Sequence, residues 1–460
     1  MKYYDAIVIG SGQAGSPLVK QLAKAGKKTA LIEKRFIGGT CVNDGCTPTK
    51  TVIGSAKAAY LINHSKALGV HVDNYQIDMK QIKARKDEIV LSWRNGGQKA
   101  IENTENLDLV FGEASFTGQK TVKVKLNDGG ELDIQADLIF INTGTTPVIP
   151  NIEGLQEVGY FISTTLLDVE YIPEHLLVLG GNYVGLEFAQ SFRRFGSKIT
   201  VLERGPRLVA REDEDISEEL TNILLAEGLD IYANAEAVKF ERENGDIKAT
   251  IIVDGRQKEI FCSDILIATG RRPLTEALNA QVAGIELDDR GYITVNDRLE
   301  TNIPGIYALG DVNGGPAFTH IAYNDYAIVY QNLFEGADQR TTGRQIPYSM
   351  YTDPQLGRIG LTEKQALEQG FNIKVAKLPM TSVARAIETG DTRGVLKAVV
   401  DADTKQILGA AVLGQEGGEI ITVLQMAMAG GITYDRLQYF IFAHPSYSES
   451  LNNLFMKLGR

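Results

Sequence analysis

The chain has 460 residues, which suggests roughly three domains at about 150 residues each. Hydrophobic residues make up 43% of it and charged residues 23%, so it can bury substantial cores and is not expected to be disordered. A net charge of −11 without a basic cluster argues against nucleic acid as a main partner, and no apolar run reaches the roughly 18 residues of a membrane span.

The start of the chain and its cysteine content predict a cytoplasmic protein. Asp5 lies where a secretory signal would be apolar. Three cysteines cannot form the disulfide scaffold of a secreted protein of this length, so a disulfide here is expected to be catalytic rather than structural.

A dinucleotide-binding turn follows the first predicted element. The apolar run 4–9 predicts a buried parallel strand, and it leads through a glycine-rich turn and a helix to a second strand that ends at Glu33. The glycines are Gly10, Gly12 and Gly15, which permit a tight turn, close approach to a pyrophosphate, and close packing of helix on strand. The N–H groups at the helix start would bind phosphate, and Glu33 would accept hydrogen bonds from a ribose.

The same pattern recurs later in the chain. A strand over 175–179 leads into Gly180 and Gly185, and a strand over 198–202 ends at Glu203. In both units 23 residues separate the first glycine from the acidic residue. Two such units imply two nucleotides, and two dinucleotides side by side suggest a flavin reduced by a nicotinamide.

The second unit departs from the pattern at one position. Asn182 stands where the middle glycine is expected, so the backbone there is predicted to lie slightly farther from the pyrophosphate. A degenerate unit that binds nothing is the alternative.

Two more predicted strands end in a glycine. One covers 138–141 and precedes Gly144, and the other covers 265–267 and precedes Gly270 and Arg271. Each lies near the end of a Rossmann-sized stretch, which suggests a crossing point between domains. Ordinary strand ends are the alternative reading.

A pair of cysteines, Cys41 and Cys46, follows the first unit. On an ideal helix they would be about 7.5 Å apart along the axis and about 140° apart around it, so a disulfide requires a distorted helix. Gly45 and Pro48 would permit that distortion, and a strained bond is easily reduced, which suits catalysis. Zinc binding lacks a second Cys or His pair at ligand spacing, and two unrelated structural cysteines are the remaining alternative. Cys262, in an apolar run, is expected to be an inert core thiol.

These motifs resemble the FAD-dependent pyridine nucleotide–disulfide oxidoreductases, the group that contains glutathione reductase, dihydrolipoamide dehydrogenase and mercuric reductase. The resemblance covers essentially the whole chain, and it rests on the redox signature from Gly39 to Lys50 and on a second FAD signature over 301–311. It implies an α/β fold with two Rossmann-type dinucleotide-binding domains and a C-terminal α+β dimerisation domain. The implied domains are 1–145 with 270–340 for FAD, 146–269 for NAD(P)H, and 341–460 for dimerisation.

The resemblance also implies roles for single residues. Cys46 would face the flavin and Cys41 would meet the substrate, while Lys50 and Glu187 would pair beside the flavin ring. Tyr183 would cover the nicotinamide pocket, with an ordinary aromatic at a helix start as the alternative. The implied contacts with FAD and with NADH or NADPH are Gly10, Gly12, Gly15, Glu33, Thr40, Gly144, Arg271 and Asp311, and Gly180, Tyr183, Gly185 and Glu203.

Near the end of the chain, His444 and Glu449 match the family's His–Glu dyad. A histidine near neutral pKa can take and return the proton of thiol–disulfide exchange, and a carboxylate fixes its tautomer. In the family this dyad reaches the flavin site of the other subunit, which implies a homodimer with shared active sites. Phe442 departs from the many members that carry a histidine there. His320 is a weaker site candidate, with a packed structural histidine as the alternative.

The sequence constrains the electron acceptor only in part. The chain ends without the cysteine pair that mercuric reductases usually carry, and Asp44, Thr47 and Thr49 depart from the commonest lipoamide-type pattern. Arg385 and the segment 391–398 look similar to the bacterial reactive-chlorine-resistance flavoproteins, described as copper(II) reductases. We therefore predict a metal ion, copper or mercury-like, or a small disulfide as acceptor, with a dihydrolipoamide dehydrogenase-like disulfide reductase as the alternative.

Glu203 favours NADH, because it would accept the ribose hydroxyls and repel a 2′-phosphate, although Arg204 and Arg207 nearby would favour NADPH. A different class, an NAD(P)H oxidase without a dithiol role or a redox-sensing flavoprotein, also stays open. An oxidase needs no His–Glu dyad and a sensor needs no nicotinamide site, and the presence of both features counts against each.

Overall fold

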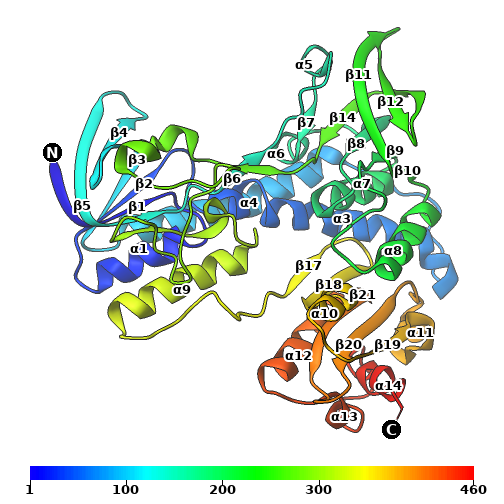
Figure 1. The fold of residues 1–460 in the computed structure, drawn as a ribbon. Coiled ribbons are helices and arrows are strands. Elements are labelled where there is room, and N and C mark those ends of the chain that lie inside the picture. The colour runs from blue at the N-terminus through cyan, green and yellow to red at the C-terminus, as the bar shows by residue number, and fades with distance from the viewer. Residues whose placement is uncertain (460) are drawn as a thin grey trace. The chain divides into compact units, whose positions relative to one another are not determined.

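The computed structural model describes residues 1–459, which form two compact units. The first unit contains residues 1–49, 84–148 and 270–344, and the second contains residues 50–83, 149–269 and 345 onward. Figure 1 shows the path of the chain and labels its elements.

The first unit is built on a six-stranded sheet in the order β1-β2-β3-β4-β5-β16, in which β1 also pairs with β5. The pairs β1–β2, β2–β3, β1–β5 and β5–β16 are parallel, and the rest of β3 and β5 joins β4 in an antiparallel meander. The strands are β1 (Lys2–Ile9), β2 (Thr29–Glu33), β3 (Leu107–Gly118), β4 (Thr121–Leu126), β5 (Glu131–Ile141) and β16 (Ile306–Ala308).

Helices α1 (Gly15–Lys24) and α9 (Thr319–Phe334) pack against each other beside this sheet (Figure 1). Leu18 and Leu22 on α1 are fully buried because they face the apolar strand β1, whose Val8 is also fully buried. This packing holds the glycine turn between β1 and α1 at the carboxyl edge of the parallel strands, the usual place for a ligand in such sheets.

Two short strands mark the points where the chain leaves and re-enters the first unit. β6 (Thr145–Pro147) pairs antiparallel with β15 (Arg271–Pro273). They directly follow the two strands that end in Gly144 and Gly270, and the unit boundaries fall beside them, after residues 148 and 269. At or near the other two boundaries, after residues 49 and 83, are the helices α2 (Gly39–Asn43), α3 (Cys46–His64) and α4 (Met79–Glu102).

The second unit contains a five-stranded parallel sheet in the order β10-β9-β8-β14-β7. Its strands are β7 (Phe161–Ile162), β8 (His175–Leu179), β9 (Lys198–Leu202), β10 (Asp230–Tyr232) and β14 (Asp264–Ile267). Helices α5 (Leu155–Val158), α6 (Ser163–Leu166), α7 (Tyr183–Phe195) and α8 (Glu214–Ala226) accompany it. An antiparallel sheet adds β11 (Ala235–Glu243), β12 (Asp246–Val253) and β13 (Arg256–Cys262).

The C-terminal part of the second unit is α+β. Its antiparallel sheet has the order β17-β18-β21-β20-β19, with α12 packed on β18 and β21. The strands are β17 (Tyr348–Met350), β18 (Gln355–Gly360), β19 (Ile373–Pro379), β20 (Val395–Asp401) and β21 (Ile407–Gly414). The helices are α10 (Glu363–Glu368), α11 (Ala384–Thr389), α12 (Gly417–Ala429), α13 (Tyr434–Leu437) and α14 (Ser450–Met456).

The mixed α/β architecture predicted from the sequence is confirmed, including every strand named in the two repeated units. Among residues 1–459, no helix combines the length and the apolar character needed to span a bilayer.

Candidate functional site

The first glycine turn is shaped by Asn142, at the end of β5. Gly10 has φ +100°, and a Cβ on it would lie 2.3 Å from the Asn142 carbonyl oxygen, so only glycine fits. The Asn142 Oδ1 accepts a hydrogen bond from the Gly15 N–H at 3.0 Å, and its Nδ2 donates to the Leu309 carbonyl at 2.8 Å. A Cβ on Gly12 would meet Oδ1 at 2.8 Å. This cradle fits a dinucleotide, because α1 begins without a side-chain cap and presents N–H groups to phosphate.

The second turn repeats this geometry with one exchange. A Cβ on Gly180 would lie 2.3 Å from the Ala268 carbonyl oxygen, so Ala268 stands where Asn142 stands in the first turn. Because Ala268 has no carboxamide to fill the space, the turn accommodates Asn182. The Asn182 side chain caps α7 by accepting a hydrogen bond from the Tyr183 N–H at 2.9 Å.

The acidic residue at the end of each second strand is tied to its own glycine turn. Glu33 accepts a hydrogen bond from the Ser11 N–H at 2.9 Å, and Glu203 accepts one from the Gly181 N–H at 2.8 Å. Each carboxylate is therefore held beside its turn, where its remaining lone pairs can accept ribose hydroxyls.

The distortion predicted between Cys41 and Cys46 is a break between two helices. Helix α2 ends at Asn43, and α3 begins with Cys46. Gly45 permits the break, because a Cβ on it would approach the Thr40 carbonyl oxygen to 2.9 Å. Pro48 is the third residue of α3, where its missing N–H leaves no helical bond unmade, so it accompanies the break without causing it.

Cys46 lies at the start of one helix and next to the start of another. It is the first residue of the 19-residue helix α3, whose N-terminal partial charge favours a thiolate. Its sulfur lies 3.3 Å from the Oγ1 of Thr319, the first residue of α9. Thr319 was not predicted as a site residue, and its neighbour His320 was named instead. His320 is exposed and stacks on Phe318 at 5.5 Å between ring centroids, so it is not a packed core histidine.

The segment that carries the cysteines is held by Arg94 of α4. Its Nε donates to Asn43 Oδ1 at 2.7 Å, and its guanidinium stacks on the Phe36 ring at 3.8 Å. Asp44, a departure from the lipoamide-type pattern, forms an ion pair with Arg35. These contacts hold α2 against α4 and against the residues that follow β2.

Asp311, Thr145 and Arg271 form a hydrogen-bonded group in the first unit. The Thr145 hydroxyl donates to Asp311 Oδ2 at 3.0 Å, and the Arg271 Nε donates to the Thr145 oxygen at 2.8 Å. Burial lowers the pKa of Arg271, and Asp311 opposes that shift. The second Asp311 oxygen is the acceptor that a ribityl hydroxyl would need. Gly144, which directly precedes Thr145, has φ +70°.

Lys50 and Glu187 form the predicted pair. Lys50, on the second turn of α3, donates to Glu187 Oε2 at 2.7 Å, and the buried Glu187 also accepts from the Tyr351 N–H at 2.8 Å. The ammonium lies 4.8 Å from the centroid of the Tyr351 ring. The Glu187 carboxylate therefore holds both the Lys50 side chain and the backbone directly after β17.

His444 and Glu449 also form the predicted pair, with Nδ1 and Oε2 2.9 Å apart. The His444 side chain is 73% exposed, whereas that of Glu449 is 20% exposed. Within its own chain, the histidine thus has one fixed edge and one edge open to another molecule.

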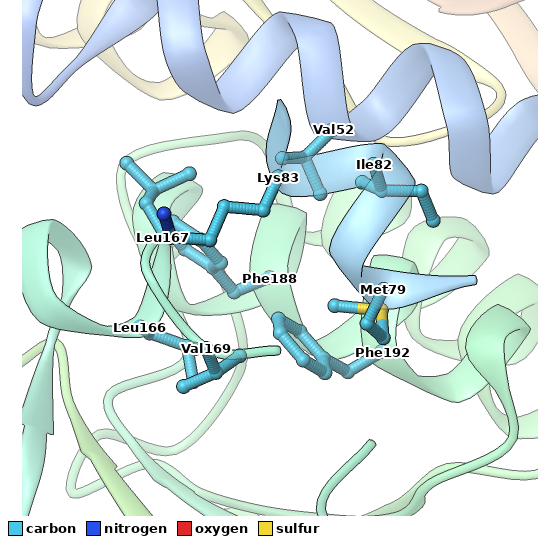
Figure 2. A pocket seen from close by; sticks show the side chains of 9 residues that line it. All are labelled: Val52, Met79, Ile82, Lys83, Leu166, Leu167, Val169, Phe188 and Phe192. Carbon is cyan, nitrogen blue, oxygen red and sulfur yellow. The ribbon is translucent and has the colours of Figure 1, made fainter. Parts of the chain in front are cut away.

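The third cysteine and an apolar pocket lie outside the candidate site. Cys262 is 2% exposed, and burial raises its pKa to about 12, which confirms an inert core thiol. A small apolar pocket in the second unit contains none of the candidate residues (Figure 2). It is lined by Val52, Met79, Ile82, Lys83, Leu166, Leu167, Val169, Phe188 and Phe192. Among residues 1–459, no group of three or more His, Cys, Asp or Glu side chains is arranged to hold a metal ion.

Comparison with known proteins gives matches over nearly the whole chain. Residues 4–325 match the model "Pyridine nucleotide-disulphide oxidoreductase", and residues 346–455 match the dimerisation domain of the same name. The chain is 40% identical over 459 residues to the Escherichia coli protein "Probable pyridine nucleotide-disulfide oxidoreductase RclA", covering 99% of both chains. It is 34% identical to a mercuric reductase of Bacillus cereus, covering 97% of this chain and 70% of the other.

A solved structure and a further sequence relative agree with these matches. The "Cu(II) complex of HOCl-induced flavoprotein disulfide reductase RclA from Escherichia coli" has a TM-score of 0.91 and 39% identity, covering 99% of both chains. A dihydrolipoyl dehydrogenase of Thermus scotoductus is 34% identical, covering 98% of this chain and 96% of the other.

Proposed function

Because the chain belongs to the pyridine nucleotide-disulphide oxidoreductase family, whose members use FAD and NAD(P)H, we propose that it passes electrons from NADH through Cys41 and Cys46 to a Cu(II) ion or a small disulfide. Its character as a flavoprotein reductase follows from the family, and the acceptor and the residue roles are the proposal.

The observation that carries the proposal is the position of Cys46. It starts α3, lies 3.3 Å from the hydroxyl of Thr319 and belongs to the same unit as the first glycine turn. A sulfur at a helix N-terminus with a hydroxyl neighbour is stabilised as the thiolate that disulfide chemistry needs. Cys41, one helix earlier, is the partner that we assign to the substrate, on the family resemblance; within this chain it is partly buried, whereas Cys46 is exposed.

The residues present fit FAD in the first unit. Gly10, Gly12 and Gly15 would approach its pyrophosphate, Glu33 would hold the ribose, and Asp311 would bind the ribityl chain. Thr40 lies in α2, and Gly144 directly precedes β6. Arg271 donates a hydrogen bond to Thr145, and Thr145 donates one to Asp311. When bound, FAD supplies the step that converts a hydride from NADH into the two electrons that a disulfide accepts.

The cysteines then carry out the exchange. Two electrons and one proton convert the Cys41–Cys46 disulfide into a thiol at Cys41 and a thiolate at Cys46. Toward a disulfide acceptor, Cys41 loses its proton to a base and attacks one acceptor sulfur, releasing the other as a thiol when it is protonated. Cys46 then attacks the Cys41 sulfur, which restores the disulfide and releases the second acceptor sulfur as a thiolate that takes a proton from solvent. Toward copper, the same two electrons reduce two Cu(II) ions to Cu(I), the disulfide forms again, and the Cys41 proton is released.

His444 is the base and acid that we assign to this exchange, and Glu449 is the residue that positions it. The exposed edge of His444 supports a role toward the partner subunit's cysteines, as does the match of residues 346–455 to a dimerisation domain. We therefore propose a homodimer in which each dyad completes the site of the other chain.

NADH is the proposed electron donor. Glu203 is held beside the second turn, where a 2′-phosphate would be repelled. The Arg207 Nη2 donates to the carbonyls of Ala210 and Glu212 at 3.3 and 3.4 Å, so it is engaged with its own loop. Arg204 is 80% exposed and lies 3.4 Å from Glu236. Tyr183, Gly180 and Gly185 complete the proposed nicotinamide site. The cytoplasm stays the predicted location, on the basis of the three cysteines.

The acceptor is proposed from two observations. The chain is more similar to the Escherichia coli protein solved as a Cu(II) complex than to the mercuric reductase or dihydrolipoyl dehydrogenase named above. Two of its three cysteines form the proposed redox pair and the third, Cys262, is buried, so the proposal involves no second cysteine pair. A lipoamide-type disulfide is the second candidate, supported by the His444–Glu449 pair.

The test is NADH oxidation by the purified holoenzyme under anaerobic conditions, with chelated Cu(II), Hg(II), oxidised glutathione and lipoamide offered separately. We expect turnover with Cu(II) or one disulfide, and its loss in Cys41→Ser. A second assay in air, without any of these acceptors, tests the alternative: NADH turnover there that survives Cys41→Ser would contradict the proposal and support an NAD(P)H oxidase.

A further inference from the structure

The side chain assigned to the nicotinamide pocket, Tyr183, is engaged by a carboxylate from the loop before α8. Its Oη donates to Glu212 Oε1 over 3.4 Å, a long hydrogen bond. The hydroxyl of Tyr348, on β17, donates to the same oxygen over 2.5 Å. The two rings lie 5.6 Å apart between centroids, tilted by 36°. Glu212 Oε1 therefore accepts one short hydrogen bond, from Tyr348, and one long one, from Tyr183.

The carboxylate itself cannot move freely. Glu212 is 2% exposed, and its second oxygen lies 3.8 Å from the guanidinium of Arg358, which is 1% exposed. Arg358 is in turn 3.2 Å from Asp213. Burial and the short hydrogen bond from Tyr348 hold the Glu212 side chain in place, while its second oxygen accepts no hydrogen bond within residues 1–459. Tyr183 is partly buried against the apolar core of the second unit, and its hydrogen bond to Glu212 is the longer of the two, so this is the bond that breaks at least cost.

We propose that Glu212 and Tyr348 are positioning residues for Tyr183: Glu212 holds it over the nicotinamide pocket, and Tyr348, which competes for the same Glu212 oxygen, sets how readily Tyr183 yields to the incoming nucleotide. This inference rests on the proposed function, because it takes the pocket of NADH to lie beside Tyr183. Glu212 and Tyr348 touch neither substrate nor cofactor in this account and act through Tyr183 alone.

Two substitutions with opposite effects follow. Tyr183→Phe removes the hydroxyl that nucleotide binding must detach, so we expect the dissociation constant for NAD⁺ to fall by about two- to tenfold. Tyr348→Phe leaves Tyr183 as the one phenol of the pair that bonds this oxygen, so its bond shortens and the dissociation constant rises by about the same factor.

The decisive variant is the double one. In a Tyr183→Phe background, Tyr348→Phe has no bond left to strengthen, and we expect it to leave the dissociation constant unchanged. The matched control is Tyr171→Phe, which removes a tyrosine hydroxyl that donates to Asp264 at 2.7 Å, at the start of β14 and away from the carboxyl ends of the strands. It should have no effect in either background.

The experiment is calorimetric titration of the holoenzyme with NAD⁺, accompanied by stopped-flow reduction with NADH. An effect of Tyr348→Phe that depends on the Tyr183 hydroxyl supports the inference. Equal effects in both backgrounds, or no change of affinity in Tyr348→Phe, would overturn it even if the wild type binds NAD⁺ and is reduced by NADH. A wild type that does neither would overturn the proposed function, and the inference with it.

Discussion

The Oδ1 of Asn142 lies 2.8 Å from the point that a Cβ on Gly12 would occupy, so the side chain of one residue decides which residue the other position accepts. In the second turn, the corresponding pair is Asn182 and Ala268, with the large and small residues exchanged. Asn142 is buried in the first turn, whereas Asn182 is exposed and caps α7. The second turn tolerates the missing glycine at 182 because Ala268 has no carboxamide to meet it.

This relationship predicts a rescue. Gly12→Ala should lower the free energy of unfolding by about 1–3 kcal/mol, because its methyl group overlaps the Asn142 carboxamide. Asn142→Ala should also be destabilising, since the Gly15 N–H and the Leu309 carbonyl lose their partners. Combined, the two should cost less than the sum of the single changes, as measured by denaturant unfolding and FAD content. Additive losses would show that the two positions are not coupled.

Much of this could be predicted from the sequence, because hydrophobic strands and glycine turns are local patterns. The strands 175–179 and 198–202 and the pairs Lys50–Glu187 and His444–Glu449 are all present as predicted. The role of Asn142 was not predicted, because it depends on a contact between residues more than a hundred positions apart. A lone asparagine at a strand end gives no periodic signal of such a contact.

Other residues were missed for the same reason. Thr319 reaches Cys46 only because α9 begins beside α3's first turn. Asp391 and Arg393 were read as marks of a subfamily, and in the structure they belong to a buried ion network with Glu227 and Asp353. Gly45 and Pro48 were both expected to permit the distortion; the break falls at Asp44 and Gly45, and Pro48 lies in the first turn of α3.

The buried network predicts acid sensitivity. Burial raises the pKa of Asp353, but Arg194 and Arg393 outweigh this and hold it below its ordinary value. A depressed pKa contributes stability that is present above the unfolded-state pKa of about 3.9 and is lost as the pH falls through the folded value. Arg194→Met should therefore destabilise the protein by about 3–5 kcal/mol and move acid unfolding to higher pH.

The midpoint of acid unfolding, followed by far-UV circular dichroism, measures this effect. Lys405→Met is the matched control, because its pair with Asp435 at 2.8 Å is exposed and should contribute little. An unchanged midpoint in Arg194→Met would mean that Asp353 keeps its low pKa without this partner.

Glu187 offers a test that separates charge from hydrogen bonding. Glu187→Gln keeps an acceptor for the Tyr351 N–H, whereas Glu187→Ala leaves that N–H and Lys50 without this partner. We expect Glu187→Ala to lower the free energy of unfolding by about 1–3 kcal/mol more than Glu187→Gln does. Thermal unfolding of both holoproteins compares them, and equal losses would assign the whole effect to the lost ion pair.

The proposed sharing of the active site between two subunits predicts complementation. Cys46→Ser and His444→Ala homodimers should each lose at least about a hundredfold in disulfide reduction. A mixed dimer would contain one intact site, with the cysteines of one chain and the dyad of the other. Differently tagged chains, co-expressed and purified as heterodimers, should recover about half of the wild-type turnover. No recovery would place the dyad in the site of its own chain or outside the site.

The most direct test of the account is whether NADH alone opens the Cys41–Cys46 disulfide. Oxidised holoenzyme would be treated anaerobically with NADH, alkylated with iodoacetamide and digested for mass spectrometry. We predict labels at Cys41 and Cys46 that appear only after NADH, with Cys262 unlabelled until the protein is denatured. A flavin that is fully reduced by NADH while neither cysteine gains a label would contradict the dithiol relay.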